Sequence, residues 1–158
     1  MKTLFIARHA EAKSNYDDFE RELSSKGLQQ AFLVGKQIAD YFLQPKEIWT
    51  SAANRTLRTA EIIAEQIGFS STIMSEKELY NASVRVWLKI IQNLQSDVVL
   101  LVGHNPHISY LAELLTGKEI GSMQTSQVLV LQSENDWSNW GEKSAQLLHS
   151  FFGESENL

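Results

Sequence analysis

The apolar residues of this chain are grouped into short continuous runs that alternate with longer amphipathic segments. The two clearest runs occupy residues 3–7 and 98–102, and the second, VVLLV, contains only valine and leucine. Runs without polar alternation predict strands covered on both faces, because a strand with one solvated face alternates polar and apolar residues. Weaker runs at 47–50, 71–74 and 127–132 predict further strands, and the last can join as an antiparallel edge.

Between these runs, apolar residues recur every three or four positions, which is the spacing of the buried face of a helix. The pattern predicts helices at 24–45, 57–67, 84–91 and 107–115, and Gly68 is a favoured residue just beyond a helix end. Strands that alternate with helices of this length form βαβ units. The sequence therefore predicts an α/β fold, a three-layer α/β/α sandwich with a mostly parallel sheet.

Length, composition and charge narrow the class of protein. The chain has 158 residues, 43% of them apolar, which suits a single domain over residues 1–158. The absence of cysteine excludes disulfides, thiolate metal sites and cysteine nucleophiles. The first apolar run is too short for a signal peptide and no stretch approaches the ~18 residues of a membrane span, so we expect a cytoplasmic protein without a membrane partner. The net charge of −5 argues against a nucleic-acid partner, although a few focused arginines can still bind a small anion.

Polar side chains follow three of the predicted strands near the point where each strand ends. They are Arg8 and His9 after the first, Arg55 after the second, and His104 and Asn105 after the strongest. In open α/β sheets, ligands bind beyond the carboxyl ends of the strands, so we expect these groups to meet in one crevice. Any one of them alone is more often a surface or turn residue, but their shared position at successive strand ends favours a site.

The residue types suit chemistry on a phosphoryl group. A neutral imidazole can attack phosphorus and hold the phosphoryl group, which divides one difficult displacement into two easier ones. The planar guanidinium of arginine binds two phosphoryl oxygens at once and stays charged at physiological pH. Asn105 and Pro106 predict the N-cap and first residue of a helix, whose positive end would lie beside His104.

Other chemistries have weaker support. His104 and His107 are three residues apart and could form a metal pair, but no carboxylate motif such as H-E-x-x-H accompanies them. The serine-hydrolase motif G-x-S-x-G and the nucleotide loop G-x-x-x-x-G-K-[ST] are both absent from the sequence. We therefore predict neither a metal site nor a cofactor.

Three blocks of the sequence resemble the histidine phosphatase superfamily. Residues 5–11, FIARHAE, are similar to its R-H-G signature, and residues 51–61, SAANRTLRTAE, to its S-x-x-x-R-A-x-Q-T-A block. Residues 102–106, VGHNP, resemble its second-histidine block. The blocks follow the family's order, and the resemblance spans roughly residues 2–132. It implies the histidine phosphatase (phosphoglycerate mutase-like) fold and phosphatase activity.

The resemblance also implies roles for individual residues. By it, His9 is the nucleophile, and Arg8, Arg55 and His104 form the phosphate pocket. Arg58 falls where the family often has Gln or Arg, so we interpret it as a supporting residue.

Residues 18–27, DFERELSSKG, resemble the D-x-x-R-P-L-S-x-x-G stretch of SixA-like members of the superfamily. In that branch Arg21 is a further phosphate ligand, and the alternative is a surface arginine paired with Asp17 or Asp18. The predicted substrate-binding residues are Arg21, Asn15 and Asn105.

Two positions depart from the family's pattern. Ala10 replaces the glycine of R-H-G, and its methyl group would strain the backbone if this position needed a positive φ. SixA-like sequences often carry alanine here, so we interpret it as a marker of that branch. Thr56 replaces the common alanine, a change that the sequence does not explain.

The substrate hypothesis depends on the leaving group. Larger members of the superfamily have insertions that supply a general acid, whereas this chain offers residues 75–81, where Glu76 and Glu78 are acid candidates or simply solvated charges. A proton donor accelerates the cleavage of a phosphate ester about 10²–10⁴-fold. In phosphohistidine the leaving group is a ring nitrogen, which protonates readily. The leading hypothesis is a phosphohistidine phosphatase whose partner is a phosphorylated protein.

Two alternatives stay open at this point. One is a phosphomonoesterase that acts on a small phosphate ester, and the other is a non-catalytic phosphate-binding module. Trp137 and Trp140 form either a packed loop or a partner surface, and we favour packing.

Overall fold

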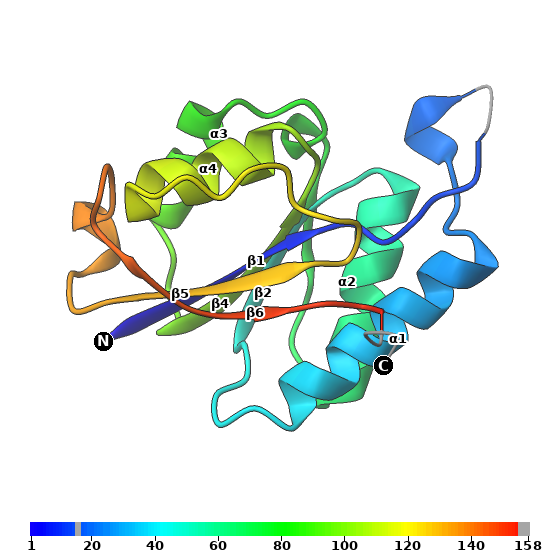
Figure 1. Cartoon of the computed structure of the whole chain (residues 1–158), viewed down its shortest axis with the longest axis horizontal. Helices are drawn as coiled ribbons and strands as arrows, with labels where there is room; N and C mark the ends of the chain where they lie inside the picture. The colour runs from blue at the N-terminus through cyan, green and yellow to red at the C-terminus, as the bar shows by residue number, and fades with distance from the viewer. Residues whose placement is uncertain (15–16, 155–158) are drawn as a thin grey trace.

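The structure, a computed structural model, describes residues 1–14 and 17–154 and consists of a mixed sheet flanked by helices (Figure 1). The strands are β1 Lys2–Arg8, β2 Glu47–Ser51, β3 Met74–Glu76, β4 Val98–Gly103, β5 Val128–Ser133 and β6 Gln146–Phe151. The helices are α1 Ser25–Ala39, α2 Asn54–Ile67, α3 Val84–Ile91 and α4 His107–Thr116, with 3₁₀ turns η1 Asp18–Glu20, η2 Lys77–Leu79 and η3 Trp137–Asn139. Within the described residues, no helix is long and apolar enough to cross a membrane.

The sheet has the strand order β3-β2-β4-β1-β5-β6. The pairs β2–β3, β2–β4 and β1–β4 are parallel, whereas β5 runs antiparallel to both β1 and β6. The prediction of a mostly parallel sheet is therefore confirmed. Strand β5 is antiparallel as expected, but it is not the edge, because β6 pairs along its outer side.

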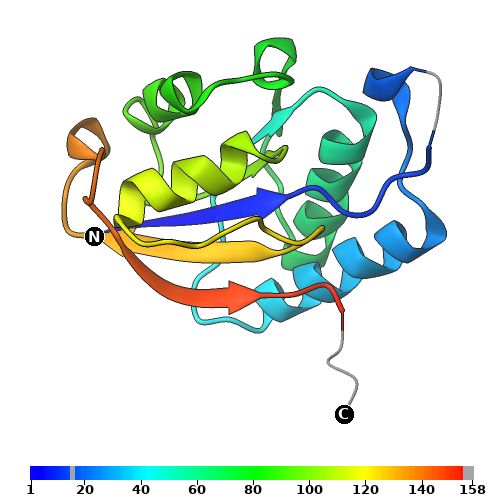
Figure 2. The same cartoon turned by 45° about the horizontal axis from the view of Figure 1, so that its top comes forward.

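Helices cover both faces of the sheet (Figure 2), and the side chains of β1 alternate between these two faces. Leu4 and Ile6 belong to a core that includes residues of α3 and α4, while Phe5 and Ala7 belong to a core with residues of α1 and α2. Because helices cover both faces, the predicted three-layer α/β/α sandwich is confirmed.

The two tryptophans near the end of β5 are packed rather than presented to a partner. Trp137 and Trp140 are buried, and their ring centroids lie 4.7 Å apart. Their indole nitrogens donate to the backbone oxygens of Ser96 (2.7 Å) and Asn135 (3.1 Å). Because the polar tip of each ring is satisfied, the favoured interpretation as a packed loop is confirmed.

Helix α1 ends at Ala39, well before Pro45, where the helix was expected to end. The side-chain amide of Gln44 donates to the carbonyls of Ile38 (3.3 Å) and Ala39 (3.2 Å). These carbonyls belong to the last turn, whose acceptors have no partner within the helix. The chain leaves the helix early because a side chain satisfies its end. Helix α2 closes as predicted, with Gly68 in the left-handed conformation.

Gly27 lies in the first turn of α1, where the helix packs against the backbone of Glu11. The hydroxyl oxygen of Ser24 accepts from the N–H of Gly27 at 3.0 Å and caps the helix. A Cβ on Gly27 would lie 1.9 Å from the carbonyl oxygen of Glu11. We expect Gly27→Ala to lower the free energy of unfolding by about 3 kcal/mol, measured by urea denaturation, because the helix must move away from the segment after His9. Gly141→Ala, whose Cβ would meet nothing within 4 Å, is the control, and an equal loss in both variants would contradict this account.

Candidate active site

The carboxyl ends of β2, β4 and β1 lie side by side because these strands are neighbours in the sheet. The N–H of His9, directly after β1, donates to the carbonyl of Gly103 at the end of β4, at 3.1 Å. The imidazole rings of His9 and His104 lie 5.4 Å apart between centroids. The structure thus brings the two predicted histidines together at this edge of the sheet.

One ring nitrogen of His9 is hydrogen-bonded to the backbone, and the other is not. Its Nδ1 lies 2.7 Å from the carbonyl oxygen of Ala10, and because a carbonyl only accepts, Nδ1 carries the hydrogen and Nε2 keeps its lone pair. Burial, opposed by the bond to Ala10 and aided by the charges of Arg55 and Arg8, lowers the pKa of His9 to about 4. The ring is therefore neutral at pH 7, as attack on phosphorus requires.

The backbone that follows His9 is anchored to α2. The N–H of Ala10 donates to the hydroxyl oxygen of Thr59 at 3.0 Å, and the same hydroxyl donates to the carbonyl of Arg55 at 2.7 Å. The φ of Ala10 is not positive, so alanine replaces the family's glycine without the backbone strain considered above.

His104 is held by Ser51, a residue for which no role was predicted. Its Nε2 lies 2.8 Å from the hydroxyl oxygen of Ser51, while its Nδ1 is buried without a hydrogen-bond partner among the described residues. Burial, together with His9 and the charge of Arg55, lowers the pKa of His104 to about 3. Ser51 is the first residue of the second block that resembles the family, and this position in the sequence could have indicated that it belongs to the site.

The two pocket arginines lie close enough to lower the pKa of His9. Arg8 donates through Nη1 to the carbonyl of Met123 (2.9 Å), and Arg55 donates through Nη1 and Nη2 to Asp18 O (2.6 Å) and Asp18 Oδ2 (3.0 Å). The Nε of each arginine is buried and has no partner among the described residues. Burial and the neighbouring charge of Arg55 lower the pKa of Arg8. Unsatisfied donors that carry positive charge are what a phosphoryl group requires.

Asp18 and Tyr80 complete the group, although neither was predicted as a site residue. The carboxylate of Asp18 accepts hydrogen bonds from the Tyr80 hydroxyl, from Arg21 at 3.1 Å and from Arg55. These bonds hold the pKa of Asp18 well below its usual range. The ring of Tyr80 meets that of His104 edge to face, with centroids 5.5 Å apart. Tyr80 is 62 residues from Asp18 in sequence, and no motif indicates it.

Arg21 is fixed at the border of this group. Its Nε donates to the carbonyl of Lys13 at 2.8 Å, and its pair with Asp18 is the alternative that the sequence left open. Its charge still contributes to the lowered pKa of His9, so it also lies near enough to act on an anion there. Asn15, the second substrate-binding candidate, falls outside the described residues.

Asn105 does not act as the predicted helix cap. Helix α4 begins at His107 and Pro106 occupies the N-cap position, so both expected positions shift by one residue. The Asn105 amide donates instead to Ser122 Oγ (2.9 Å) and Met123 O (2.9 Å). The capping prediction is wrong because the side-chain oxygen of Asn105, which would accept from helical N–H groups, accepts instead from the hydroxyl of Ser109 at 2.5 Å. Met123 O also binds Arg8, so Asn105 supports the loop that orients an arginine.

Thr56, Glu76 and Glu78 are the remaining positions that the sequence singled out. The hydroxyl of Thr56 donates to the carbonyls of Ser51 (2.9 Å) and Ala53 (3.0 Å), which gives a structural reason for a threonine there. Glu76 ends β3 and is paired in register with Ser51, whereas the side chain of Glu78 is exposed.

His107, the expected partner in a metal pair, lies at the start of α4 with its ring near Tyr110, 6.5 Å between centroids. Over residues 1–14 and 17–154, no group of three or more His, Asp or Glu side chains is arranged to hold a metal ion.

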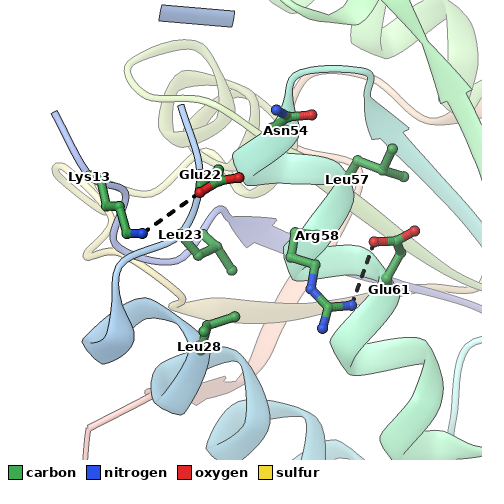
Figure 3. Close-up of a pocket in the computed structure, with 8 residues that line it drawn as sticks. All are labelled: Lys13, Glu22, Leu23, Leu28, Asn54, Leu57, Arg58 and Glu61. Atoms are coloured by element: carbon green, nitrogen blue, oxygen red, sulfur yellow. Dashed lines mark ion pairs between the residues drawn. The ribbon is translucent and has the colours of Figure 1, made fainter. Parts of the chain in front are cut away.

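A hollow of about 370 Å³ lies between α2, the start of α1 and the segment that precedes α1 (Figure 3). Its lining residues are Lys13, Glu22, Leu23, Leu28, Asn54, Leu57, Arg58 and Glu61. Arg58 Nη1 lies 3.7 Å from Glu61 Oε1, so this arginine turns along its own helix toward a carboxylate. Neither histidine of the pair lines the hollow, and of the three arginines only Arg58 does, whereas Arg8 and Arg55 do not.

The lowered pKa values predict that His9 and His104 stay neutral in mildly acidic solution. Both values, about 4 and about 3, lie below the 6.5 of an ordinary histidine. In NMR spectra of the ring Cε1–H groups, both rings should still be neutral at about pH 5.5. Inorganic phosphate should raise both pKa values, because a nearby anion favours the charged imidazole. His9→Gln and His104→Gln assign the signals, and titration of either ring at an ordinary value without phosphate would contradict the prediction.

Comparisons with known proteins agree with the predicted family. The sequence profile of the histidine phosphatase superfamily (branch 1) matches residues 4–87. No protein with a curated description matches the chain by sequence.

Two solved structures, assigned as candidate phosphohistidine phosphatases SixA, are similar in fold. The one from Nakamurella multipartitia is 24% identical, with 95% of each chain covered and a TM-score of 0.80. The one from Agrobacterium tumefaciens is 25% identical, with 95% of this chain and 97% of that chain covered and a TM-score of 0.81. The protein histidine phosphatase SixA complexed with tungstate is 20% identical, over 96% and 97% of the chains, with a TM-score of 0.84.

Proposed function

Because this chain belongs to the histidine phosphatase superfamily, we propose that it is a phosphohistidine phosphatase that acts on a phosphorylated protein through a covalent phospho-His9 intermediate. The observation that carries the proposal is the state of His9. Its Nδ1–H is bonded to the backbone and its Nε2 is unprotonated, beside His104 and two arginines. The tungstate complex of SixA supports it, since tungstate is a tetrahedral oxyanion like phosphate.

In the first displacement, His9 Nε2 attacks phosphorus while the bond from phosphorus to the leaving group breaks. Arg8 and Arg55 donate to the phosphoryl oxygens, whose charge is spread over them in the transition state. His9 becomes positively charged as it takes the phosphoryl group, so the hydrogen bond from its Nδ1 to Ala10 strengthens. These contacts improve as the reaction proceeds, and contacts of that kind raise the rate.

In the second displacement, water attacks the phosphorus of phospho-His9. The bond from phosphorus to Nε2 breaks, the electron pair returns to the ring, and the water releases a proton as phosphate forms. His9 leaves this step neutral because Nδ1 has kept its hydrogen throughout. The enzyme's own leaving group therefore needs no proton donor.

The leaving group of the substrate argues for phosphohistidine over a phosphate ester. A proton donor to the leaving oxygen raises the rate of ester cleavage about 10²–10⁴-fold. Asp18, the carboxylate bonded to pocket Arg55, is held ionised by Tyr80, Arg21 and Arg55, so it has no proton to give at neutral pH. An imidazole whose other nitrogen carries a proton departs as a neutral ring without such help. The site thus suits a phosphorus–nitrogen bond.

The test compares one peptide sequence phosphorylated on either histidine or serine, with p-nitrophenyl phosphate as a third substrate. We expect kcat/KM to be highest for the phosphohistidine peptide. A higher value for the phosphoserine peptide or for p-nitrophenyl phosphate would replace the proposal with a phosphomonoesterase. Turnover of none of the three would favour a phosphate-binding module.

A further inference from the structure

The carboxylate of Asp18 lies where the site meets solvent. It bonds to Arg55, whose side chain is 8% exposed, yet its own side chain is 53% exposed. It also affects the pKa of His104, so it lies within electrostatic reach of the pair of imidazoles. Asp18 is therefore a fixed negative charge between the phosphate-binding arginine and the side from which a protein substrate must approach.

Asp18 still has room for one further hydrogen bond. An ionised carboxylate offers about four lone-pair positions. Tyr80, Arg21 and Arg55 supply one donor each. Because Arg21 is the contact on Oδ1 and the side chain is half exposed, that oxygen can accept a donor from outside.

Phosphohistidine brings such a donor. When one ring nitrogen holds the phosphoryl group, the other carries a proton in the reactive form. An anionic acceptor at that N–H favours the protonated ring, because a nearby negative charge raises the pKa of an imidazole. A phosphate ester has no corresponding group.

We propose that Asp18 accepts a hydrogen bond from the distal ring N–H of the substrate's phosphohistidine and thereby selects phosphohistidine over phosphate esters. This inference rests on the function proposed above. Tyr80, Arg21 and Arg55 hold the carboxylate ionised and in place, so that it acts as an acceptor and not as an acid.

The step balances without an added acid. His9 Nε2 donates its electron pair to phosphorus, and the pair of the broken phosphorus–nitrogen bond goes to the leaving ring nitrogen. The substrate ring begins as a cation, with its distal N–H bonded to Asp18, and ends as neutral imidazole that keeps the same hydrogen. The positive charge passes to His9, whose Nδ1–H is bonded to Ala10 in the same way.

The experiment measures kcat/KM against pH for Asp18→Asn on N-phosphoimidazole and on p-nitrophenyl phosphate. Asparagine keeps an oxygen for Arg55 and Tyr80 but loses the charge. We expect the ratio of kcat/KM for N-phosphoimidazole to that for p-nitrophenyl phosphate to fall about 10-fold, the usual scale of a charged hydrogen bond. The alkaline limb of the N-phosphoimidazole profile should also move to lower pH, because the distal nitrogen loses its proton more readily.

The matched control is Glu20→Gln, which removes one negative charge from the same 3₁₀ turn. Glu20 contacts Asn54 through its backbone and side-chain oxygens, at 2.9 and 3.1 Å, and makes no bond to Arg55. Its substrate ratio and pH profile should match the wild type. An equal loss on both substrates in Asp18→Asn, with an unmoved alkaline limb, would show that Asp18 only positions Arg55 and would overturn the inference. Failure of the wild type to hydrolyse the phosphohistidine peptide through His9 would overturn the proposed function itself.

Discussion

Replacing His9 by alanine is expected to lower kcat/KM by about 10⁴-fold or more on any phosphorylated substrate, the scale seen when an enzyme loses its covalent nucleophile. The arginines remain, so the variant should still bind inorganic phosphate. A loss of turnover with retained phosphate binding would separate attack on phosphorus from recognition of the phosphoryl group.

The intermediate gives a second measurement for the same prediction. Wild-type protein mixed with substrate and quenched in base, where phosphohistidine is stable, should gain the mass of one phosphoryl group, and His9→Ala should not. His107→Ala is the control, since this residue starts α4 and its ring lies near Tyr110. The assignment of the nucleophile would be contradicted if the His9→Ala variant gained a phosphoryl group, or if the His107→Ala variant failed to gain one.

The grouping of His9, Arg55 and His104 was predictable because it depends on strand ends. Short apolar runs identified the strands, and the polar residues after them had to lie at one edge of a parallel sheet. The order of the strands was not needed for that prediction. The direct neighbours β1 and β4 bring His9 within hydrogen-bond distance of Gly103, which is closer than strand position alone required.

The contact between Asp18 and Tyr80 could not be predicted in the same way. Their contact joins η1 to the residue after η2, and no periodicity or motif relates two such segments. The end of α1 was missed for a similar reason, since Gln44 satisfies the helix from beyond it. Asn105 had the residue type of a cap, but its side-chain oxygen accepts from Ser109 while its amide nitrogen donates to Ser122 and Met123. In each case, a contact between separate segments decided the outcome over a local preference.

Replacing Arg55 by alanine is expected to lower kcat/KM by about 10²–10³-fold, mostly through kcat, the usual cost of losing one donor to developing charge. Two effects act in the same direction. The phosphoryl oxygens lose a buried cation, and Asp18 loses the partner that offsets its negative charge beside the incoming phosphate. Arg58→Ala is the matched control, because it lies on the same helix but pairs with Glu61 and is half exposed. A similar loss in both variants would contradict the separation of their roles.

The lysine variant decides which property of Arg55 matters. Arg55 uses one N–H of Nη1 and one N–H of Nη2 to hold Asp18, and its other donors, the buried Nε–H among them, remain for a phosphoryl oxygen. A lysine ammonium keeps the charge, but it lacks the planar set of donors with which arginine can bind Asp18 and a phosphoryl oxygen at the same time. We therefore expect Arg55→Lys to remain closer to Arg55→Ala than to the wild type in kcat. Near-complete rescue by lysine would mean that charge alone is required, and the bridging of Asp18 and phosphate by one guanidinium would then be wrong.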